Sequence, residues 1–222
     1  MAGERIKLYS YWRSSAAYRV RIALNLKGLP YELIPVHLIN NGGEHHSEAY
    51  QEINPQQKVP TLIDGERIIR QSMAIVEYIE ETYDGEHRLM PVMARERARV
   101  RALAQIVACD IHPVNNLSVM QYLEHEFNTP QVERDRWTRH WITEGFKGLE
   151  KLLATNPSTG QFCEGDEPSL ADICLIPQVY NAYRWSVDMD QFPLIRKISD
   201  ECMKMEAFDR AKPENQPDAP KA

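Results

Sequence analysis

The spacing of apolar and polar residues changes several times within roughly the first eighty positions. Residues 6–11 alternate as in a strand, and residues 31–38 form a second short apolar stretch. Between them, apolar residues recur every three or four positions along residues 16–24, which predicts a helix that begins near Ser14 and ends at Gly28. A strand, a helix and a strand so closely spaced predict a right-handed crossover with the two strands parallel.

A hairpin and a second helix follow in the same part of the chain. Two apolar runs within residues 59–69 are separated by Asp64-Gly65, a dipeptide typical of tight hairpins. The period then returns to that of a helix, which starts near Gln71. The order βαβ followed by ββα predicts a thioredoxin-like α/β domain over residues 1–84.

The rest of the chain is predicted to be helical. The periodicity lapses over residues 85–93, which we interpret as a linker. Residues 94–212 show helical spacing and no convincing strand, so an all-α domain is expected there. Within it, Ser169 and Asp172 have the spacing of a capping box. Residues 213–222 hold three prolines and few apolar residues, and we expect a disordered tail.

Charge and cysteine usage exclude several classes of protein. The net charge of −6 and the lack of a Lys/Arg-rich run argue against a nucleic-acid partner. The short polar N-terminus, and the absence of about 18 consecutive apolar residues, predict neither secretion nor a membrane span. The four cysteines lack CxxC and metal-ligand spacing, which favours free thiols in the reducing cytoplasm, and no metal site is expected.

The turn before the first helix is the place where a thioredoxin-like domain presents its chemistry, because the helix N-terminus offers unpaired N–H groups. Here that turn contains Ser14 and Ser15 and no CxxC pair, which argues against disulfide exchange. A serine hydroxyl at this place can donate a hydrogen bond to a thiolate and lower the pKa of the thiol. The alternative is that both serines only cap the helix.

Two further signals suggest peptide binding, each with a simpler alternative. The Val59-Pro60 bond, between a loop and a strand, can be cis and present the Val59 main chain to an extended peptide, or it can be an ordinary trans proline. Gln71 and Ser72 open the second helix, where N–H groups and a hydroxyl can hold a carboxylate or can simply cap the helix.

These signals gain weight together, because the stretch Ser-Tyr-Trp-Arg-Ser-Ser-Ala-Ala-Tyr-Arg-Val-Arg-Ile-Ala-Leu at residues 10–24 resembles the signature of zeta-class glutathione transferases. The resemblance runs from about residue 6 to about residue 218. The serine-rich signature is specific to that class, whereas the Val-Pro and Gln-Ser motifs mark the wider superfamily. Further matches are Asn54–Leu62, Gln71-Ser72, Ile111–Ser118, Gly165-Asp166, Leu170–Asp172 and Pro177–Val179.

The resemblance implies a site for glutathione as cofactor. Ser14 would activate the thiolate, and Ser15 would contact glutathione beside it. Ala16 stands where the family usually has cysteine, which weakens any argument for a protein thiol there. The residues implied to hold the tripeptide are Val59 for its cysteinyl backbone, Gln71 and Ser72 for the γ-glutamyl end, His45 for the glycyl end, and His112, Asn116, Leu117 and Ser118 for a wall from the helical domain.

The implied activity is the cis–trans isomerisation of maleylacetoacetate to fumarylacetoacetate by reversible thiolate addition. The resemblance also implies that the protein is a homodimer and that it acts in aromatic degradation through tyrosine or a related acid. A cis-dicarboxylate substrate requires a local positive pocket in this acidic chain. Arg13, beside the serine turn, and Arg184, whose family counterpart faces the same cleft, suit that task. Arg19 and Arg21 are expected to be solvated, or paired along the first helix.

Three alternatives remain open at this stage. A maleylpyruvate isomerase uses the same chemistry on a smaller diacid. A general conjugating transferase or a dehalogenase of 2-halo acids would consume glutathione instead. A non-catalytic glutathione-binding module would bind the tripeptide without turnover.

Overall fold

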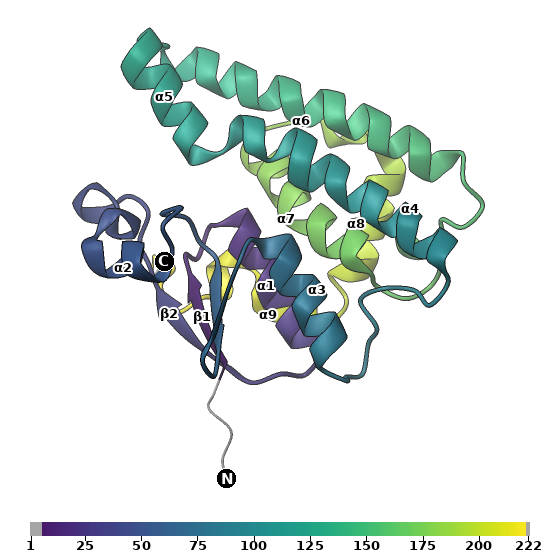
Figure 1. Cartoon of the computed structure of the whole chain (residues 1–222). Coiled ribbons are helices and arrows are strands. Elements are labelled where there is room, and N and C mark those ends of the chain that lie inside the picture. Colours follow the sequence, from purple (N-terminus) through teal and green to yellow (C-terminus); the bar gives the residue numbers. More distant parts are fainter. Residues whose placement is uncertain (1–5, 221–222) are drawn as a thin grey trace. The chain divides into compact units, whose positions relative to one another are not determined.

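The computed structural model describes residues 6–220 and divides them into two compact units (Figure 1). The first unit contains residues 6–89 together with residues 204–220, and the second contains residues 90–203. The predicted combination of a thioredoxin-like α/β domain and an all-α domain is confirmed, but the first unit extends beyond the predicted boundary and also includes the C-terminal segment.

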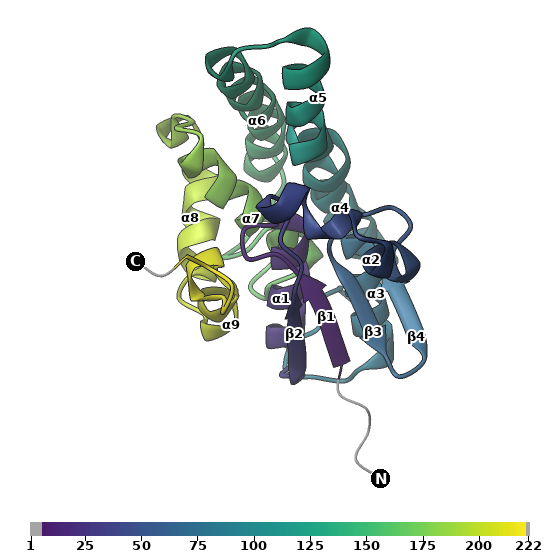
Figure 2. The same ribbon diagram turned by 90° about the vertical axis from the view of Figure 1, so that its left-hand side faces the viewer.

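The sheet of the first unit has the strand order β2-β1-β3-β4 (Figure 2). β1 pairs with β2 in parallel and with β3 antiparallel, and β3 pairs antiparallel with β4. β4 therefore runs parallel to β1, so the chain leaves β1, β2 and β4, and enters β3, at one edge of the sheet. We call this the C-terminal edge, after the end of β1. The strands are β1 (Ile6–Ser10), β2 (Tyr31–Pro35), β3 (Thr61–Asp64) and β4 (Arg67–Arg70).

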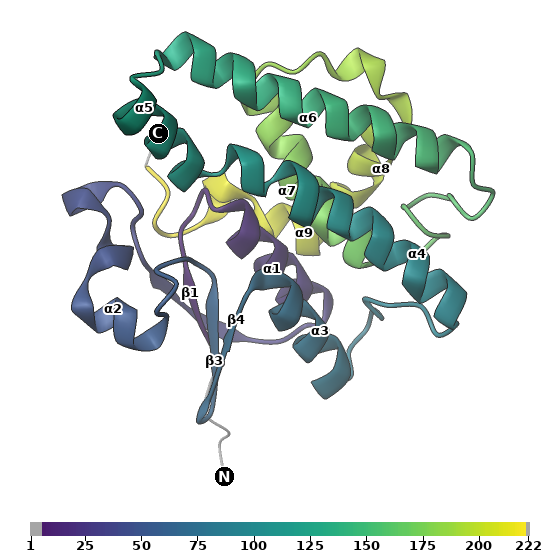
Figure 3. The same ribbon diagram turned by 45° about the horizontal axis from the view of Figure 1, so that its top comes forward.

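Helices cover both faces of this sheet, with α1 and α3 on one face and α2 on the other (Figures 1 and 3). The apolar side chains of β1, α1 and α3 form the core, in which Leu8, Leu24 and Ile75 are fully buried. The helical elements of the first unit are α1 (Ser15–Leu26), η1 (Asn40–Gly42), η2 (Glu44–His46), α2 (Glu48–Ile53), α3 (Ser72–Thr82), α9 (Glu206–Ala211) and η6 (Pro213–Asn215). The sequence pattern did not predict α2, whose single buried residue is Tyr50.

The first unit continues beyond the predicted boundary at residue 84. Leu89 is buried, and its N–H donates to a carboxylate oxygen of Glu80 at 2.9 Å. The same carboxylate forms an ion pair with Lys27 at 2.7 Å. A Cβ at Gly85 would lie 2.9 Å from the Cα of Lys27, so only glycine allows the chain to approach α1 this closely. Most of the expected linker therefore belongs to the first unit.

The C-terminal segment is also a correction, because residues 213–220 were expected to be disordered. α9 packs on α1, where the Asn25 side chain donates to the Ala207 carbonyl at 2.9 Å and Arg21 donates to the Ala211 carbonyl at 3.0 Å. Further along, Asp218 accepts a hydrogen bond from the Trp12 N–H at 2.8 Å. Within residues 213–220, this long-range hydrogen bond acts together with local ones, in which the Gln216 amide donates to the carbonyls of Arg210 and Lys212.

The second unit is built around α7, of which 12 of 15 residues are buried. α7 packs against α4 and α8. The predicted capping box is confirmed, because the Asp172 carboxylate accepts the Ser169 N–H at 2.8 Å and Ser169 accepts the Ala171 N–H. The elements of the second unit are α4 (Ala94–Gln105), the π-helical η3 (Ile106–Ile111), η4 (Pro113–Asn115), α5 (Leu117–Phe127), α6 (Gln131–Ala154), α7 (Leu170–Arg184), η5 (Met189–Gln191) and α8 (Pro193–Cys202).

Candidate functional site

Ser14 lies at the C-terminal edge of the sheet, as the N-cap of α1. Its backbone is extended, and its Oγ accepts a hydrogen bond from the Ala17 N–H at 3.2 Å. This bond uses a lone pair of the oxygen and leaves the hydroxyl proton available to a ligand. Capping and thiolate activation, which the sequence offered as alternatives, are therefore compatible in one side chain. Ser15 is buried as the first residue of α1, and Ala16 follows it half-buried.

The buried Arg21 side chain anchors the main chain of this turn by hydrogen bonds. Its guanidinium donates to the carbonyl of Trp12 at 3.0 Å, to that of Tyr11 at 3.4 Å and to the Ser10 hydroxyl at 3.1 Å. The side chain is fully buried, and this burial lowers the pKa of Arg21 to about 10. The expectation that Arg21 is solvated or paired along its helix is thus wrong, because its partners are main-chain carbonyls and a hydroxyl outside that helix.

Val59 lies at the same edge, immediately before β3. Its bond to Pro60 is cis. The preceding carbonyl of Lys58 accepts hydrogen bonds from the Tyr50 hydroxyl at 2.8 Å and from the Asn54 amide at 2.7 Å. In a trans peptide the N–H points opposite to the C=O, so this anchorage also fixes the direction of the Val59 N–H. Within residues 6–220, neither main-chain polar group of Val59 takes part in a hydrogen bond.

Gln71 and Ser72 begin α3 at this edge. Gln71 has a φ of 69° and a ψ of 119°, a conformation that non-glycine residues rarely adopt and that costs on the order of 1–3 kcal/mol. Its side-chain amide donates a hydrogen bond to the side-chain Oε1 of Gln56 at 2.8 Å. The Ser72 side chain is buried, and its Oγ accepts a hydrogen bond from Arg19 at 3.2 Å. Arg19 is therefore also not solvated, contrary to expectation.

His45 lies in η2, on the connection that leaves β2 at the C-terminal edge. The residue is 8% exposed, and its ring lies against that of His46, with the ring centroids 3.8 Å apart and the ring planes tilted by 41°. Burial, and then the neighbouring His46, lower the pKa of His45. Within the described part of the chain its Nδ1 has no hydrogen-bond partner. A Cβ at Gly43 would lie 2.4 Å from the ring, so glycine is required there for the ring to occupy this position.

Arg13 precedes the serine turn, with its guanidinium 5.2 Å from the centre of the Trp12 ring. This cation–π contact restricts the orientation of the side chain without neutralising its charge. Arg13 is half-buried and therefore can still meet an anion at the C-terminal edge.

The remaining predicted residues belong to the second unit, around the turn that links η3 to α5. Asn116 is the N-cap of α5, and its Oδ1 accepts from both the N–H and the hydroxyl of Ser118 at 2.8 Å. Leu117 and Ser118 are exposed, and His112 ends the π-helical segment. π-Helical turns are rare and occur often at functional sites.

Arg184 is the last residue of α7, and its guanidinium stacks on Trp185 at 4.6 Å from the ring centre. The side chain is exposed. A planar guanidinium held on an indole ring is restricted in orientation.

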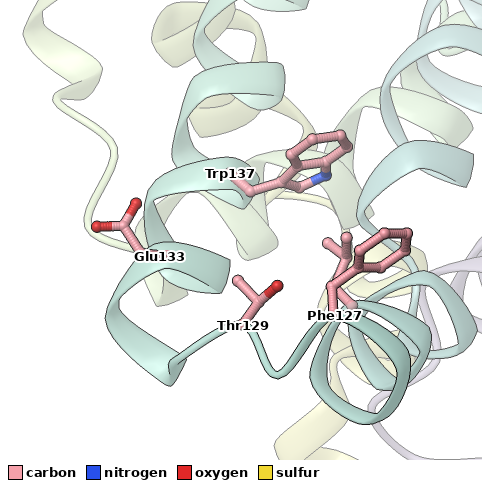
Figure 4. Close-up of a pocket in the computed structure, with 5 residues that line it drawn as sticks. Phe127, Thr129, Glu133 and Trp137 are labelled. Atoms are coloured by element: carbon pink, nitrogen blue, oxygen red, sulfur yellow. The ribbon is translucent and has the colours of Figure 1, made fainter.

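The structure thus gathers Ser14, Val59, Ser72 and the connection that carries His45 at one edge of one sheet. The four residues of the η3–α5 segment form a second group, in the other unit. A hollow of about 340 Å³ between α5 and α6 contains none of the predicted residues. Figure 4 shows Phe127 and Trp137 on opposite sides of this hollow, which is lined by Leu123, Phe127, Thr129, Glu133 and Trp137.

Sequence reasoning missed the residues that hold this site in place. Gln56, Tyr50 and Asn54 fix the loop around Val59 and Gln71, while Arg21 and Asp218 fix the serine turn. The Asn-Pro-Gln-Gln run marks the first loop as part of the family pattern, but no local signal in the sequence identifies Asp218.

The described residues contain neither a cluster of metal-ligating side chains nor a membrane-spanning helix. In residues 6–220, no three His, Cys, Asp or Glu side chains are arranged to hold a metal ion. No helix in that part of the chain combines the length and apolar character needed to cross a membrane.

These features define the glutathione transferase fold. They are a four-stranded mixed sheet, a first helix capped by serine, a cis proline before β3, and a separate all-α unit. Residues 8–87 match the family model described as glutathione S-transferase, N-terminal domain. A probable maleylacetoacetate isomerase from Vibrio cholerae is 50% identical over 96% of this chain and 97% of its own length.

Two solved structures are similar over nearly the whole chain. One is the holo structure of a maleylpyruvate isomerase, described as a bacterial zeta-class glutathione transferase, with a TM-score of 0.93, 47% identity and coverage of 96% of this chain and 100% of its own. The other is a maleylacetoacetate isomerase from Methylobacterium extorquens with bound malonate and glutathione, with a TM-score of 0.93, 42% identity and coverage of 97% and 100%. The present chain belongs to the zeta-class glutathione transferases, the family of the maleylacetoacetate and maleylpyruvate isomerases.

Proposed function

We propose that this enzyme isomerises maleylacetoacetate to fumarylacetoacetate with glutathione as its cofactor. The proposal depends mainly on the geometry of Ser14. Its Oγ accepts the capping hydrogen bond of α1, and its hydroxyl can at the same time donate a hydrogen bond to a ligand at the C-terminal edge. The relative from Vibrio cholerae that is named a probable maleylacetoacetate isomerase supports the choice of substrate. The Methylobacterium structure, with glutathione and the dicarboxylate malonate bound, supports the pairing of this cofactor with a small diacid.

The residues at the C-terminal edge fit glutathione in their donor and acceptor chemistry. The free N–H and C=O of Val59 suit an extended peptide that pairs with the main chain just before β3. The Ser72 hydroxyl and the start of α3 suit a carboxylate, and the unpartnered Nδ1 of buried His45 suits the polar glycyl end. These features together support a tripeptide with a carboxylate at each end.

Glutathione, when bound, supplies a thiolate that adds reversibly to the cis double bond, which permits rotation before the thiolate leaves again. A free thiol with a pKa of about 8.5 is only a few per cent ionised near neutral pH, so the protein must stabilise the anion. Ser14 does this by donating a hydrogen bond from its hydroxyl to the sulfur, and the N-terminus of α1 adds favourable partial charge. Ser15, next to it, contacts the same ligand.

The substrate carries two carboxylates, and the chain carries a net charge of −6. Arg13 and Arg184 therefore bind the substrate carboxylates, each with its guanidinium oriented by an indole ring. We assign His112, Asn116, Leu117 and Ser118 of the second unit to contacts with glutathione, as the family resemblance implies. The cap that Asn116 forms on Ser118 supports this role, because it makes the start of α5 rigid.

The decisive test is an absorbance assay of maleylacetoacetate isomerisation with the purified protein. Turnover should require glutathione, leave its concentration unchanged, and be absent with S-methylglutathione, which has no free thiol. Stoichiometric loss of glutathione would indicate a conjugating transferase or a dehalogenase. Glutathione binding without any turnover of a cis-diacid would indicate a binding module, and either result would reject the isomerase.

Maleylpyruvate is the second candidate substrate, because the maleylpyruvate isomerase structure is 47% identical to this chain. The two diacids should be assayed side by side under the same glutathione concentration. A higher kcat/KM for maleylpyruvate than for maleylacetoacetate would make it the preferred substrate and would leave the proposed chemistry intact.

We further infer a cytoplasmic homodimer that acts in the degradation of tyrosine or a related aromatic acid. Four cysteines without disulfide partners suit a reducing compartment. Two adjacent apolar side chains before α4, Val92 and Met93, are 70% and 62% exposed, which suits a contact with a second copy. Sedimentation equilibrium and cell fractionation test these points, and growth of a deletion strain on tyrosine tests the pathway.

A further inference from the structure

Arg19 is a buried cation that no acidic group of the described chain neutralises. It lies on α1, is 2% exposed, and donates from Nη1 to the Ser72 hydroxyl oxygen at 3.2 Å. Its Nε and Nη2 are buried and have no hydrogen-bond partner within residues 6–220. Buried charges in proteins are normally paired, because removal of an ion from water is costly. An unpaired arginine at this depth therefore indicates an anion that the free chain lacks.

The contact with Ser72 determines how this charge is presented at the C-terminal edge. The Ser72 oxygen accepts a hydrogen bond from the guanidinium. The Ser72 hydroxyl can therefore donate its own hydrogen bond to a ligand. Ser72 is also the first residue of α3, an 11-residue helix whose N-cap, Gln71, gives no side-chain hydrogen bond to the first turn. The Ser72 hydroxyl and the positive end of the α3 helix dipole thus face an anion together, with the Arg19 charge behind them.

We propose that Arg19 is the positioning residue for the α-carboxylate of the γ-glutamyl residue of glutathione, and that it acts through the Ser72 hydroxyl. The inference rests on the proposed function, which assigns that end of the tripeptide to Gln71 and Ser72. Arg19 polarises the Ser72 hydroxyl and fixes its rotamer, so that Ser72 donates to the carboxylate. Because the guanidinium is shielded from solvent, counterions screen its charge little.

Three tripeptides separate this role from a structural one. Glutathione has both charged groups at its γ-glutamyl end, 4-aminobutanoyl-Cys-Gly lacks the α-carboxylate, and glutaryl-Cys-Gly lacks the α-amine. Their Kd values are measured by calorimetry with the full-length protein and with Arg19→Met. We expect wild type to bind the analogue without carboxylate about 10-fold or more weakly than glutathione. In Arg19→Met that ratio should fall towards one, while the ratio for the analogue without amine should stay unchanged.

Two further variants serve as controls. Arg67→Met removes an exposed arginine from β4 of the same unit and should leave every ratio as in wild type. Arg19→Lys keeps the charge but loses the planar donor set, and should give an intermediate ratio. It also keeps the test valid if Arg19→Met does not fold, because wild type and Arg19→Lys can be compared alone.

An unchanged carboxylate ratio in a folded Arg19 variant would overturn the inference. A shift from dimer to monomer with the ratio unchanged would also overturn it and would assign Arg19 to a carboxylate of a second copy. These results are distinct from failure of the proposed function, in which wild type binds none of the three tripeptides or binds glutathione without isomerising a cis-diacid.

Discussion

Asp218 accepts a hydrogen bond from the main-chain N–H of Trp12 at 2.8 Å, although the two residues are 206 positions apart. Trp12 directly precedes Arg13 and the serine turn, and its carbonyl accepts from Arg21 at 3.0 Å. Both main-chain polar groups of Trp12 are therefore engaged by charged side chains. The turn that presents Ser14 is held in place by the last part of the described chain.

Loss of the Asp218 carboxylate should loosen this turn. Asp218→Ala is expected to destabilise the protein by about 1–2 kcal/mol, which is less than the roughly 1.5–3 kcal/mol of a hydrogen bond to a fully buried charged group because Asp218 is partly exposed. The melting temperature from circular dichroism and the kcat of isomerisation should both fall. Asp200→Ala removes an exposed carboxylate from α8 and should change neither. Equal behaviour of the two variants would show that Asp218 does not position the turn.

Ser14→Ala should raise the pKa of bound glutathione. A hydrogen bond to a charged group contributes about 1.5–3 kcal/mol, which corresponds to roughly one to two pKa units. The ultraviolet absorbance of the thiolate, titrated in the complex, measures this pKa directly. The variant also loses the N-cap of α1, at a cost of about 1 kcal/mol in stability. Ser15→Ala should have the smaller effect on the pKa, and the reverse order would assign the activating hydroxyl to Ser15.

Arg184→Ala should weaken binding of the diacid more than it slows the chemical step. We expect KM to rise by about tenfold or more with a smaller change in kcat, since a guanidinium–carboxylate contact is made before and during the reaction. Arg184→Lys should recover part of the loss, because the charge remains while the planar donor set is lost. Arg136→Ala, which removes an exposed arginine from α6, is the control. An unaltered KM in Arg184→Ala would exclude Arg184 from the site.

His45 should make the stability of the protein sensitive to acid. Its pKa is below the ordinary 6.5 because it is buried and because His46 lies beside it, so the folded state favours the neutral ring. The contribution is therefore fully present above about pH 6.5 and is lost as the pH falls, since the unfolded chain then binds the proton first. His37, His46 and Glu44 are the other titratable groups of this connection.

The measurement for His45 is the midpoint of urea unfolding across this pH range. In wild type the midpoint should fall from neutral to acidic pH, and in His45→Gln the fall should be smaller. His46 remains in the variant and serves as an internal reference for the rest of the connection. An identical fall in both proteins would mean that His45 does not contribute to the pH dependence.

The sequence indicated the C-terminal edge well, because its elements follow local rules. The alternation before Ser14, the Asp64-Gly65 turn and the start of α3 each depend on neighbours a few positions away, and together they define the sheet order that gathers Val59 and Ser72. α2 escaped detection because a six-residue helix with one buried residue, Tyr50, has no measurable period.

Long-range polar anchors could not be predicted from the pattern. Charged residues on helices are usually solvated, so Arg19 and Arg21 were expected in water. Their burial depends on partners such as Ser72 and the Ala211 carbonyl, which are brought near by the fold and leave no mark in the local sequence. The same holds for the C-terminal segment, where Asp218 is a single polar residue in a proline-rich stretch that resembles a disordered tail.

The return of residues 204–220 to the first unit has a consequence for biosynthesis and for engineering. During translation, α1 and the serine turn leave the ribosome long before α9 and Asp218, so the first unit cannot reach its final form until the chain has been made as far as residue 218. A fragment cut after residue 89 would leave Arg21 without its Ala211 partner and would uncover one side of α1. Chimeras that exchange this half between relatives should therefore exchange both ends of the chain together.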